Sequence, residues 1–318
     1  MQPAFFSTTL LPTTQNPAEV SLTRLADGRI AAAWSASSLD NEAQRSIWFS
    51  IQGQSGWLAA RLIASRESTA GGTFTHAGAL GHPILHAEGG WLHLWFTSHD
   101  GLAGASLNHS TSTNGGQSWT KPAKLQISPL ATGDLQPGSP PTLLDDGGLD
   151  LPLGGHGELL RLSATGHIVD KQRLPLPGKQ TSIIVIDAQQ ALALQGDING
   201  GPVQTLRTVD GGQHWQAGNA LPIASSPFAA IRLHSGRLLL AGNPDSNRAT
   251  LRLWLSTDSG QTWQPSKTLE AAADGAADFS EPALLLGSDG RIHLAYGFRH
   301  QGIKYASFNE AWLDGSAP

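Results

Sequence analysis

The chain has 318 residues, of which 14% are charged, and it contains 37 glycines and 19 prolines with a formal net charge of -5. That length suits one large domain or two ordinary ones. Few charges and many turn residues favour short strands over long helices. The net negative charge, without any cluster of lysine and arginine, argues against nucleic acid as a partner. The absence of cysteine excludes disulfides, thiolate zinc sites and a cysteine nucleophile.

The N-terminal stretch MQPAFFSTTLLPTTQ has neither the basic region nor the long apolar segment of a secretory signal peptide. No run of about 18 apolar residues occurs elsewhere in the chain. As written, the sequence therefore predicts a cytoplasmic protein without a membrane span.

Along the chain, an apolar run, a short polar turn and a second apolar run recur six times, which is typical of β-hairpins. About 40 to 60 residues separate successive turns, and this is the length of a four-stranded propeller blade. The turns lie near Gly28, Gly90, Gly148, Gln189, Gly236 and Gly290.

A second motif places a hydroxyl residue seven positions before a tryptophan. Its copies are SIQGQSGW from Ser50, STNGGQSW from Ser112, TVDGGQHW from Thr208 and STDSGQTW from Ser256, and the first of these is degenerate. The Asp or Asn at the third position can bond to its own turn backbone, glycine permits positive φ, and the tryptophan supplies a large apolar face. We expect a structural turn between the third and fourth strands of a blade.

Together these repeats predict an all-β fold, a six-bladed β-propeller in a single domain covering residues 1–318. The N-terminal strand FFSTTLL is expected to complete the last blade beside IKYASFNEAWL. The alternative is a β-sandwich whose turns are similar by chance. The predicted blades cover approximately residues 14–62, 76–128, 135–176, 178–222, 225–270 and 277–315.

The tryptophan turns resemble the Asp-boxes, or BNR repeats, of the sialidase (neuraminidase) superfamily, whose fold is a six-bladed propeller. From about residue 226 to 313, the segments GNPDSNRATLRLWLSTDSGQTW and DFSEPALLLGSDGRIHLAYGF are similar to the last two blades of sialidases and of bacterial predicted neuraminidases. This resemblance is specific for the fold. It says less about activity, because Asp-boxes lie away from the active site.

In that family three arginines bind the sialic acid carboxylate, a tyrosine activated by a glutamate is the nucleophile, and an aspartate is the acid/base. The resemblance places Arg248 at the third arginine. At the tyrosine position the chain has Phe279, which carries no hydroxyl, and we expect Tyr296 to pack in the core. In the blade-one loop, Asp40 and the nearby Glu42 are placed like the family aspartate.

The remaining family positions are occupied by other residue types. Where the first arginine belongs, the sequence offers Asn16 and Glu19, and the glutamate and second arginine fall near Gln180 and Gln195. The bidentate carboxylate clamp that arginines provide is therefore expected to be largely missing.

In a propeller, the loops at one end of the inner strands line the usual pocket. We predict that three carboxylates there are catalytic, namely Asp40, Asp197 and Glu281. The predicted substrate-binding side chains are Arg248, His82, His99, Asp100, His156, Asn243 and Arg299, and the same loops also carry Ser98, Asn199, Asp245 and His300. Carboxylates, imidazoles, amides and arginines suit sugar hydroxyls and acid/base work on a glycosidic bond.

The resulting hypothesis is a carbohydrate-active protein, a glycoside hydrolase that acts on an acidic or modified sugar. A non-catalytic glycan-binding propeller is the main alternative, and a protein-interaction platform is a third. A glycan is the expected partner, and no cofactor or metal is expected. The alternative of a metal held by His82, His99, Asp100, His156 and Asp197 lacks a paired spacing such as HExxH. His214 is expected to be structural.

Overall fold

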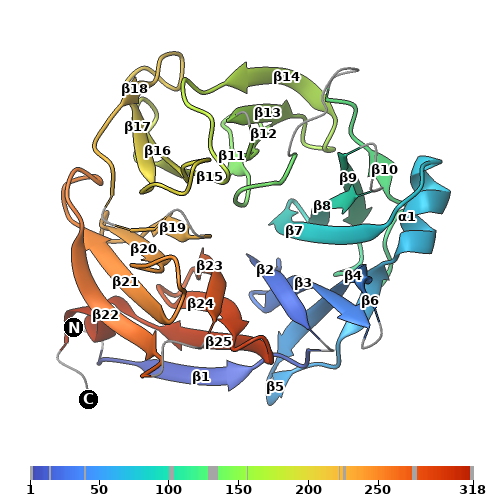
Figure 1. Ribbon diagram of the computed structural model, residues 1–318, viewed down its shortest axis with the longest axis horizontal. Helices are drawn as coiled ribbons and strands as arrows, with labels where there is room; N and C mark the ends of the chain where they lie inside the picture. The colour runs from blue at the N-terminus through green and yellow to red at the C-terminus, as the bar shows by residue number, and fades with distance from the viewer. Residues whose placement is uncertain are drawn as a thin grey trace. The chain divides into compact units, whose positions relative to one another are not determined.

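The computed structural model describes residues 3–13, 16–38, 41–99, 104–127, 135–155, 157–221, 223–224, 227–273 and 278–315, with the backbone alone for 38 and 41–43. Within these residues the strands form six antiparallel sheets (Figure 1). Residue contacts divide the chain into two compact units. We call residues 12–181 the N-terminal unit, and residues 182–318 with 1–11 the C-terminal unit.

Three sheets make up the N-terminal unit. Their strands are β2 (Pro17–Arg24), β3 (Ile30–Ser38), β4 (Asn41–Gly53), β5 (Gly56–Trp57) and β6 (Arg61–Ala64); β7 (Ala79–Glu88), β8 (Trp91–His99), β9 (Ala105–Ser112) and β10 (Ala123–Lys124); and β11 (Thr142–Leu143), β12 (Leu149–Pro152), β13 (Glu158–Leu162) and β14 (Ile168–Arg173). Each strand pairs with the next along the chain, except that β6 pairs with β4. Between the first two sheets lies helix α1 (Arg66–Thr73), capped by Ser65.

The C-terminal unit carries the other three sheets. Their strands are β15 (Thr181–Val185), β16 (Ala191–Gln195), β17 (Gln204–Thr208) and β18 (Gln216–Ala217); β19 (Ala229–Arg232), β20 (Leu238–Gly242), β21 (Thr250–Ser256) and β22 (Gln264–Ala271); and β23 (Phe279–Leu286), β24 (Ile292–Phe298), β25 (Gly302–Phe308) and β1 (Phe6–Leu10). Helix α2 (Glu310–Asp314) follows β25.

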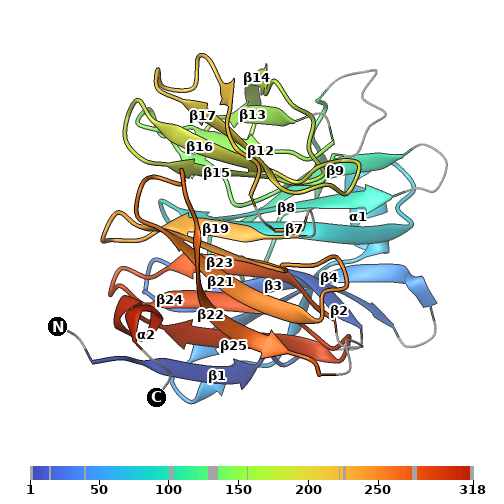
Figure 2. The ribbon, with the colours of Figure 1, turned by 60° about the vertical axis from the view of Figure 1, so that its left-hand side comes forward.

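The last sheet joins the two ends of the chain. Strand β1 pairs antiparallel with β25, from Phe6 opposite Phe308 to Leu10 opposite Lys304, and lies beside it in Figure 2. Phe6 also stacks on Trp312 of α2, with ring centroids 4.6 Å apart. The N-terminal strand is therefore the outermost strand of this sheet, as the sequence predicts.

Apolar residues of the second and third strands of each sheet supply the core. In the N-terminal unit, Trp34 and Trp95 are fully buried, and in the C-terminal unit Leu240 and Leu294 are as well. The hairpin turns use glycine where φ is positive, as at Gly28 (87°). These local features are the reason that the apolar runs form hairpins.

The tryptophan turns are structural, which confirms that prediction. In STDSGQTW, Ser256 Oγ donates to Asp258 Oδ1 (2.8 Å) and accepts from Gly260 N (2.7 Å), while Asp258 Oδ1 accepts from Thr262 N (2.9 Å). Bonds from Thr262 and Ser256 lower the pKa of Asp258 to about 2. Trp263 is 7% exposed. The turns that begin at Ser112 and Thr208 repeat these bonds.

The degenerate copy that begins at Ser50 differs from the other three. Gln52 pairs with Trp57 and Gly53 with Gly56, so this segment is a tight hairpin between β4 and β5. His214, in the third copy, bonds to Asp210 within its own turn and is structural, as expected.

Six antiparallel sheets built from successive strands confirm the predicted all-β, six-bladed β-propeller. The extent of the single domain, and its blade boundaries, stay predictions. No helix among the described residues is both long enough and apolar enough to cross a membrane.

Candidate functional site

Backbone strain marks one end of the strands in four of the six sheets. Nine non-glycine residues in the described part of the chain have left-handed φ, and seven of them lie where a first strand begins or where a second strand turns into the third. These seven are Asn16, Glu19, His82, Arg248, Glu281, Arg299 and His300. Left-handed backbone at a non-glycine residue raises the conformational energy of the folded chain by roughly 1–2 kcal/mol. Strain of this kind collects at functional sites, so these strand ends are the first place to look for one.

Three of the strained residues sit in β-bulges of first strands. Glu19 (φ 56°), His82 (φ 48°) and Glu281 (φ 53°) each fall where the pairing with the second strand shifts register. A bulge turns a side chain away from the regular pleat. The same device therefore presents a polar side chain at the start of β2, β7 and β23.

In the N-terminal unit this device brings together a partly buried carboxylate and imidazole. Glu19 Oε1 lies 3.2 Å from His82 Nε2, and Glu19 Oε2 accepts hydrogen bonds from Ser35 Oγ (2.6 Å) and from the backbone N of His82 (2.8 Å). The side chains of Glu19 and His82 are 18% and 28% exposed. His82 Nδ1 lies 3.2 Å from Thr97 Oγ1, which donates to Gly81 O. Both oxygens of the carboxylate are thus occupied.

Arg45 on β4 completes the Glu19 cluster through Ser35. Its guanidinium donates to Ser35 Oγ (2.7 Å) and to Ser35 O (3.2 Å), and Ser35 Oγ in turn donates to Glu19. Burial by itself raises the pKa of the Glu19 carboxyl, but the charge of His82 and the bonds from Ser35 and the His82 backbone, with the Arg45 charge, outweigh it and lower that pKa. The cluster is a satisfied charged network.

In the C-terminal unit, cationic side chains gather around Asp278, just before β23. Its Oδ2 lies 3.2 Å from His300 Nε2 and 3.7 Å from Arg248 Nη1. The Arg299 guanidinium lies 5.8 Å from the ring centroid of Phe279. Exposed fractions are 35% for Arg248, 78% for His300 and 18% for Asp278. Arg248 and His300 thus face the Asp278 carboxylate, and the Arg299 guanidinium lies over the aromatic rings that follow it on β23 and β24. Guanidinium groups of this kind suit an anionic ligand.

Backbone bonds fix this region. Phe279 N donates to Arg248 O (3.0 Å), and Arg299 N donates to Asp278 O (2.7 Å). Asn243, only 1% exposed, donates from Nδ2 to Phe279 O (2.8 Å) and Thr250 O (2.7 Å). Asn243, predicted to bind substrate, therefore ties β20, β21 and β23 together in this structure.

The other described candidates lie on separate strand ends. Asp197 follows β16, is half-buried and accepts from Asn199 N (2.7 Å) in a tight turn. His99 ends β8 and is also half-buried, and its carbonyl accepts from Gly78 N (2.6 Å). Glu281 is half-buried in its bulge. Asp40, Asp100 and His156 lie outside the described residues.

No group of three His, Cys, Asp or Glu side chains within the described part of the chain could hold a metal ion. Of the five residues considered for a metal, Asp100 and His156 are not among those described. His82 is bonded instead to Glu19 and Thr97.

Phe279 and Tyr296, the two residues weighed against the tyrosine of the resembling family, are both buried. Phe279 is 1% exposed, and Tyr296, also 1% exposed, packs in the core as predicted. Tyr296 donates to Glu270 Oε1 (2.7 Å), which Lys304 also contacts. Burial and the Glu270 contact raise the Tyr296 pKa. A buried phenol with a raised pKa is a poor nucleophile.

Sequence reasoning missed three members of these clusters. Asp278 and Arg45 do not stand out in the sequence, and Glu19 does so only as a residue found where the family's first arginine belongs. A signal exists for Asp278 and Glu19, because acidic residues at the start of a blade's first strand recur in PAEV and DFSEP. No local pattern identifies Arg45, since its contact depends on the pairing of β3 with β4.

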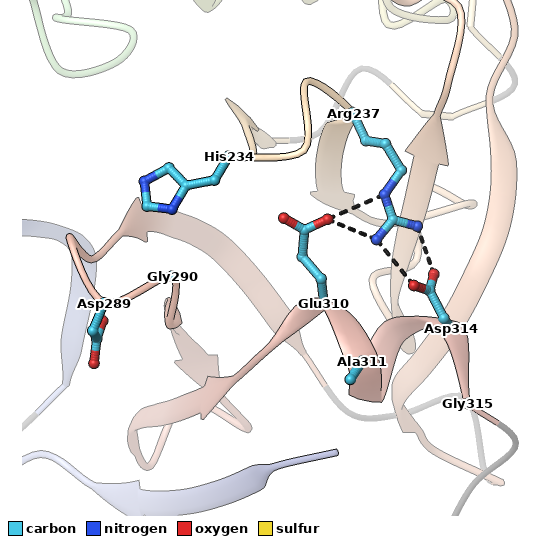
Figure 3. A pocket seen from close by; sticks show the side chains of 8 residues that line it. All are labelled: His234, Arg237, Asp289, Gly290, Glu310, Ala311, Asp314 and Gly315. Atoms are coloured by element: carbon cyan, nitrogen blue, oxygen red, sulfur yellow. Dashed lines mark hydrogen bonds and ion pairs between the residues drawn. The ribbon is translucent and has the colours of Figure 1, made fainter. Parts of the chain in front are cut away.

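A surface hollow lies at the opposite end of β23 (Figure 3). It has a volume of about 650 Å³, and its lining includes His234, Asp289 and the helix α2. Arg237 lies between Glu310 (2.7 Å) and Asp314 (2.5 Å), so its guanidinium anchors α2 to the turn between β19 and β20. We interpret this hollow as the edge of the ion-paired contact that holds α2 against the turn between β19 and β20.

A model of the BNR repeat-like domain family matches residues 28–294, so the chain belongs to this family. No curated protein sequence matches the chain significantly. Similar solved structures include sialidases and an arabinanase. They show that the chain has a sialidase-like fold.

Three of these structures illustrate the likeness. The chain is similar to a Hadza microbial sialidase, with a TM-score of 0.68 and 15% identity, covering 92% of this chain and 65% of that one. The NanB sialidase from Streptococcus pneumoniae has a TM-score of 0.73 and 11% identity, covering 97% of this chain and 70% of that one. The α-L-arabinanase from Penicillium chrysogenum complexed with arabinobiose has a TM-score of 0.67 and 12% identity, covering 97% of this chain and 99% of that one. The chain thus spans just under two thirds of the length of the first sialidase.

Proposed function

We propose that this protein is a glycoside hydrolase that acts on an acidic or modified sugar, with its site at the start of β23. The observation that carries the proposal is the cationic cluster of Arg248, Arg299 and His300 on strained backbone around Asp278. Guanidinium groups recognise carboxylates by paired charge-assisted hydrogen bonds. A sugar with an anionic substituent fits this chemistry.

The carboxylates of the loops supply the acid/base chemistry in this proposal. Glu281 lies in the bulge of β23, three residues after Asp278, and Asp197 follows β16 in the same unit. Asp40, in the blade-one loop, is the remaining candidate from the sequence. With Phe279 in place of a tyrosine, the nucleophile is water, and hydrolysis then needs one proton acceptor and one proton donor.

A glycan-binding propeller without activity is the second candidate, and one observation favours it. The residue at the family's nucleophile position, Phe279, is buried and has no hydroxyl, and Tyr296 is bonded to Glu270. In that case the same cationic cluster binds an acidic sugar and no bond is broken. The similar arabinanase and sialidases carry enzyme names, which supports the first candidate over this one.

A screen that measures binding and turnover separately tests the proposal. The probes are free N-acetylneuraminic acid and D-glucuronic acid in thermal-shift assays, and the 4-methylumbelliferyl glycosides of the same acids in hydrolysis assays. We expect binding of at least one acid and hydrolysis of its glycoside. Binding without hydrolysis would select the binding propeller. The absence of both would contradict an acidic-sugar site.

A further inference from the structure

The Asp278 carboxylate is incompletely satisfied. Oδ1 is buried, and no described residue donates a hydrogen bond to it. Oδ2 has the ion pair with His300 at 3.2 Å, whereas Arg248 at 3.7 Å is beyond hydrogen-bond distance. A buried carboxylate oxygen without a donor costs about 1–3 kcal/mol, so such a group calls for an explanation.

Relaxation of the main chain does not relieve this cost. Bonds from Arg299 N to Asp278 O and from Phe279 N to Arg248 O hold the backbone on both sides of the carboxylate. Asn243 holds the next carbonyl, that of Phe279. The carboxylate is therefore fixed where the described residues offer it too few donors.

Glu19 shows that this fold can satisfy a carboxylate at the start of a first strand. In that case Ser35, the His82 backbone and the His82 ring all contact the carboxylate, at 2.6 to 3.2 Å. The contrast indicates that the deficit at Asp278 is specific to its site. Because Oδ1 is buried, Oδ2 is the oxygen that a ligand can reach, between two cationic side chains of which His300 is mostly exposed.

We propose that Asp278 is a catalytic residue, the general base that activates the attacking water. This inference rests on the proposed function and adds a residue to it. The water oxygen forms a bond to the anomeric carbon, and its proton passes to Asp278 Oδ2. The bond from that carbon to the leaving oxygen breaks, and the leaving oxygen keeps the electron pair and takes a proton from Glu281. Arg248 and Arg299 hold the anionic substituent.

This division of roles predicts different responses to the leaving group. A sugar alkoxide must be protonated as it leaves, whereas 4-methylumbelliferone is acidic enough to leave without help. Loss of Glu281 therefore harms hydrolysis of a disaccharide more than of the aryl glycoside. Loss of Asp278 harms both equally, because both reactions need the activated water.

The test compares Asp278→Asn, Glu281→Gln and the control Asp289→Asn with the unchanged protein. Asp289 is 61% exposed, pairs with Arg291 and lies at the other end of β23. Substrates are the 4-methylumbelliferyl glycoside that the unchanged protein hydrolyses and the disaccharide with the same acidic sugar. We expect Asp278→Asn to lower kcat about 100-fold or more on both, with a melting temperature no lower than that of the unchanged protein and with the free acid still bound. Asp289→Asn is expected to behave as the unchanged protein.

Activity of Asp278→Asn within about threefold of the unchanged protein would overturn the inference and leave the proposed function standing. So would equal losses in Glu281→Gln on both substrates, because Glu281 would then not be the acid. If the unchanged protein binds the acid and hydrolyses neither substrate, the base role is rejected in favour of the binding propeller. If it neither binds nor hydrolyses, the proposed function fails and the inference with it.

Discussion

The starts of β2 and β23 carry comparable carboxylates in opposite states. At β2, Glu19 is surrounded by donors and bound to His82 and, through Ser35, to Arg45. At β23, Asp278 has one buried oxygen without a donor among the described residues and an arginine too distant for a hydrogen bond. The difference teaches that position in a blade does not decide a side chain's role. The number of hydrogen-bond partners is the better guide to that role. A carboxylate whose oxygens all have donors stabilises the fold, whereas one that lacks donors can still bind a ligand.

The largest effect that we expect concerns pH and the polar core of the N-terminal unit. His86, His93 and His109 lie on three neighbouring strands, and His93 Nδ1 is 3.0 Å from His109 Nε2. Burial lowers their pKa values to about 4, 4 and 3, and the charge of His93 adds to this for the other two. These groups thus stay neutral in the folded state while the unfolded chain takes up protons.

The folded pKa values of these histidines lie below the unfolded value of 6.5, so their contribution to stability is complete above about pH 6.5 and is lost as the pH falls toward 4. Urea unfolding at several pH values should show this loss. His109→Gln should flatten the curve, whereas His76→Gln, an exposed control, should leave its slope unchanged. Parallel curves for all three proteins would contradict a structural role for these imidazoles.

Removal of Glu19 sharpens the comparison directly. Glu19→Ala removes the shorter-range acceptor of Ser35 and the carboxylate that contacts His82, and we expect the loss of this partly buried network to cost about 2–3 kcal/mol. Urea denaturation at pH 7 should show a lower midpoint. Glu88→Ala, at an exposed position of β7, is the control. A cost below about 0.5 kcal/mol, as for an ordinary surface substitution, would mean that the Glu19 network is not structural.

Replacement of Asn243 tests whether this polar residue, which contacts the backbone next to Asp278, is structural. Asn243→Ala leaves the carbonyls of Thr250 and Phe279 without a donor, and we expect a loss of about 2 kcal/mol in the free energy of unfolding. The measurement is again urea denaturation. If stability is retained and acid binding alone is lost, Asn243 is the substrate-binding residue that the sequence predicted.

The smallest effect that we expect is the loss of affinity when Arg248 is replaced. Arg248→Ala should weaken binding of the free sugar acid about tenfold, which corresponds to about 1.4 kcal/mol. Because Arg248 is 35% exposed and does not form a hydrogen bond with Asp278, stability should hardly change. Calorimetric titration measures the affinity, with Arg232→Ala, exposed on β19, as the control. Unchanged affinity would remove Arg248 from the anion site.

The fold could be predicted from sequence because its signals are local. Hairpin turns and Asp-boxes such as Ser256 to Trp263 lie within a few residues of their own partners. Arg248 can also be singled out from the sequence, since it stands in a recognisable frame just before β21, and its role stays a prediction. The family match, which covers residues 28–294, rests on the same repeats.

The partners within the site could not be predicted, because they depend on contacts between distant segments. Glu19 and His82 are 63 positions apart in the sequence, and Asn243 and Phe279, which are hydrogen-bonded, are 36 positions apart. The left-handed backbone at Glu281 could not be predicted from sequence either, since glutamate is not a residue type enriched at positive φ. Asp278 has an ordinary sequence context, and what distinguishes it is a buried oxygen to which no described residue donates.

The most direct test of this account compares the unfolding free energies of Asp278→Asn and Glu19→Gln at pH 7. Each exchange removes one charge with little change in shape. The account predicts opposite signs. Asp278→Asn should stabilise the protein by about 0.5–1.5 kcal/mol, because it relieves a site kept for function, whereas Glu19→Gln should destabilise it by about 2 kcal/mol or more. Destabilisation by both exchanges to a similar degree would contradict the claim that one carboxylate serves the fold and the other a ligand.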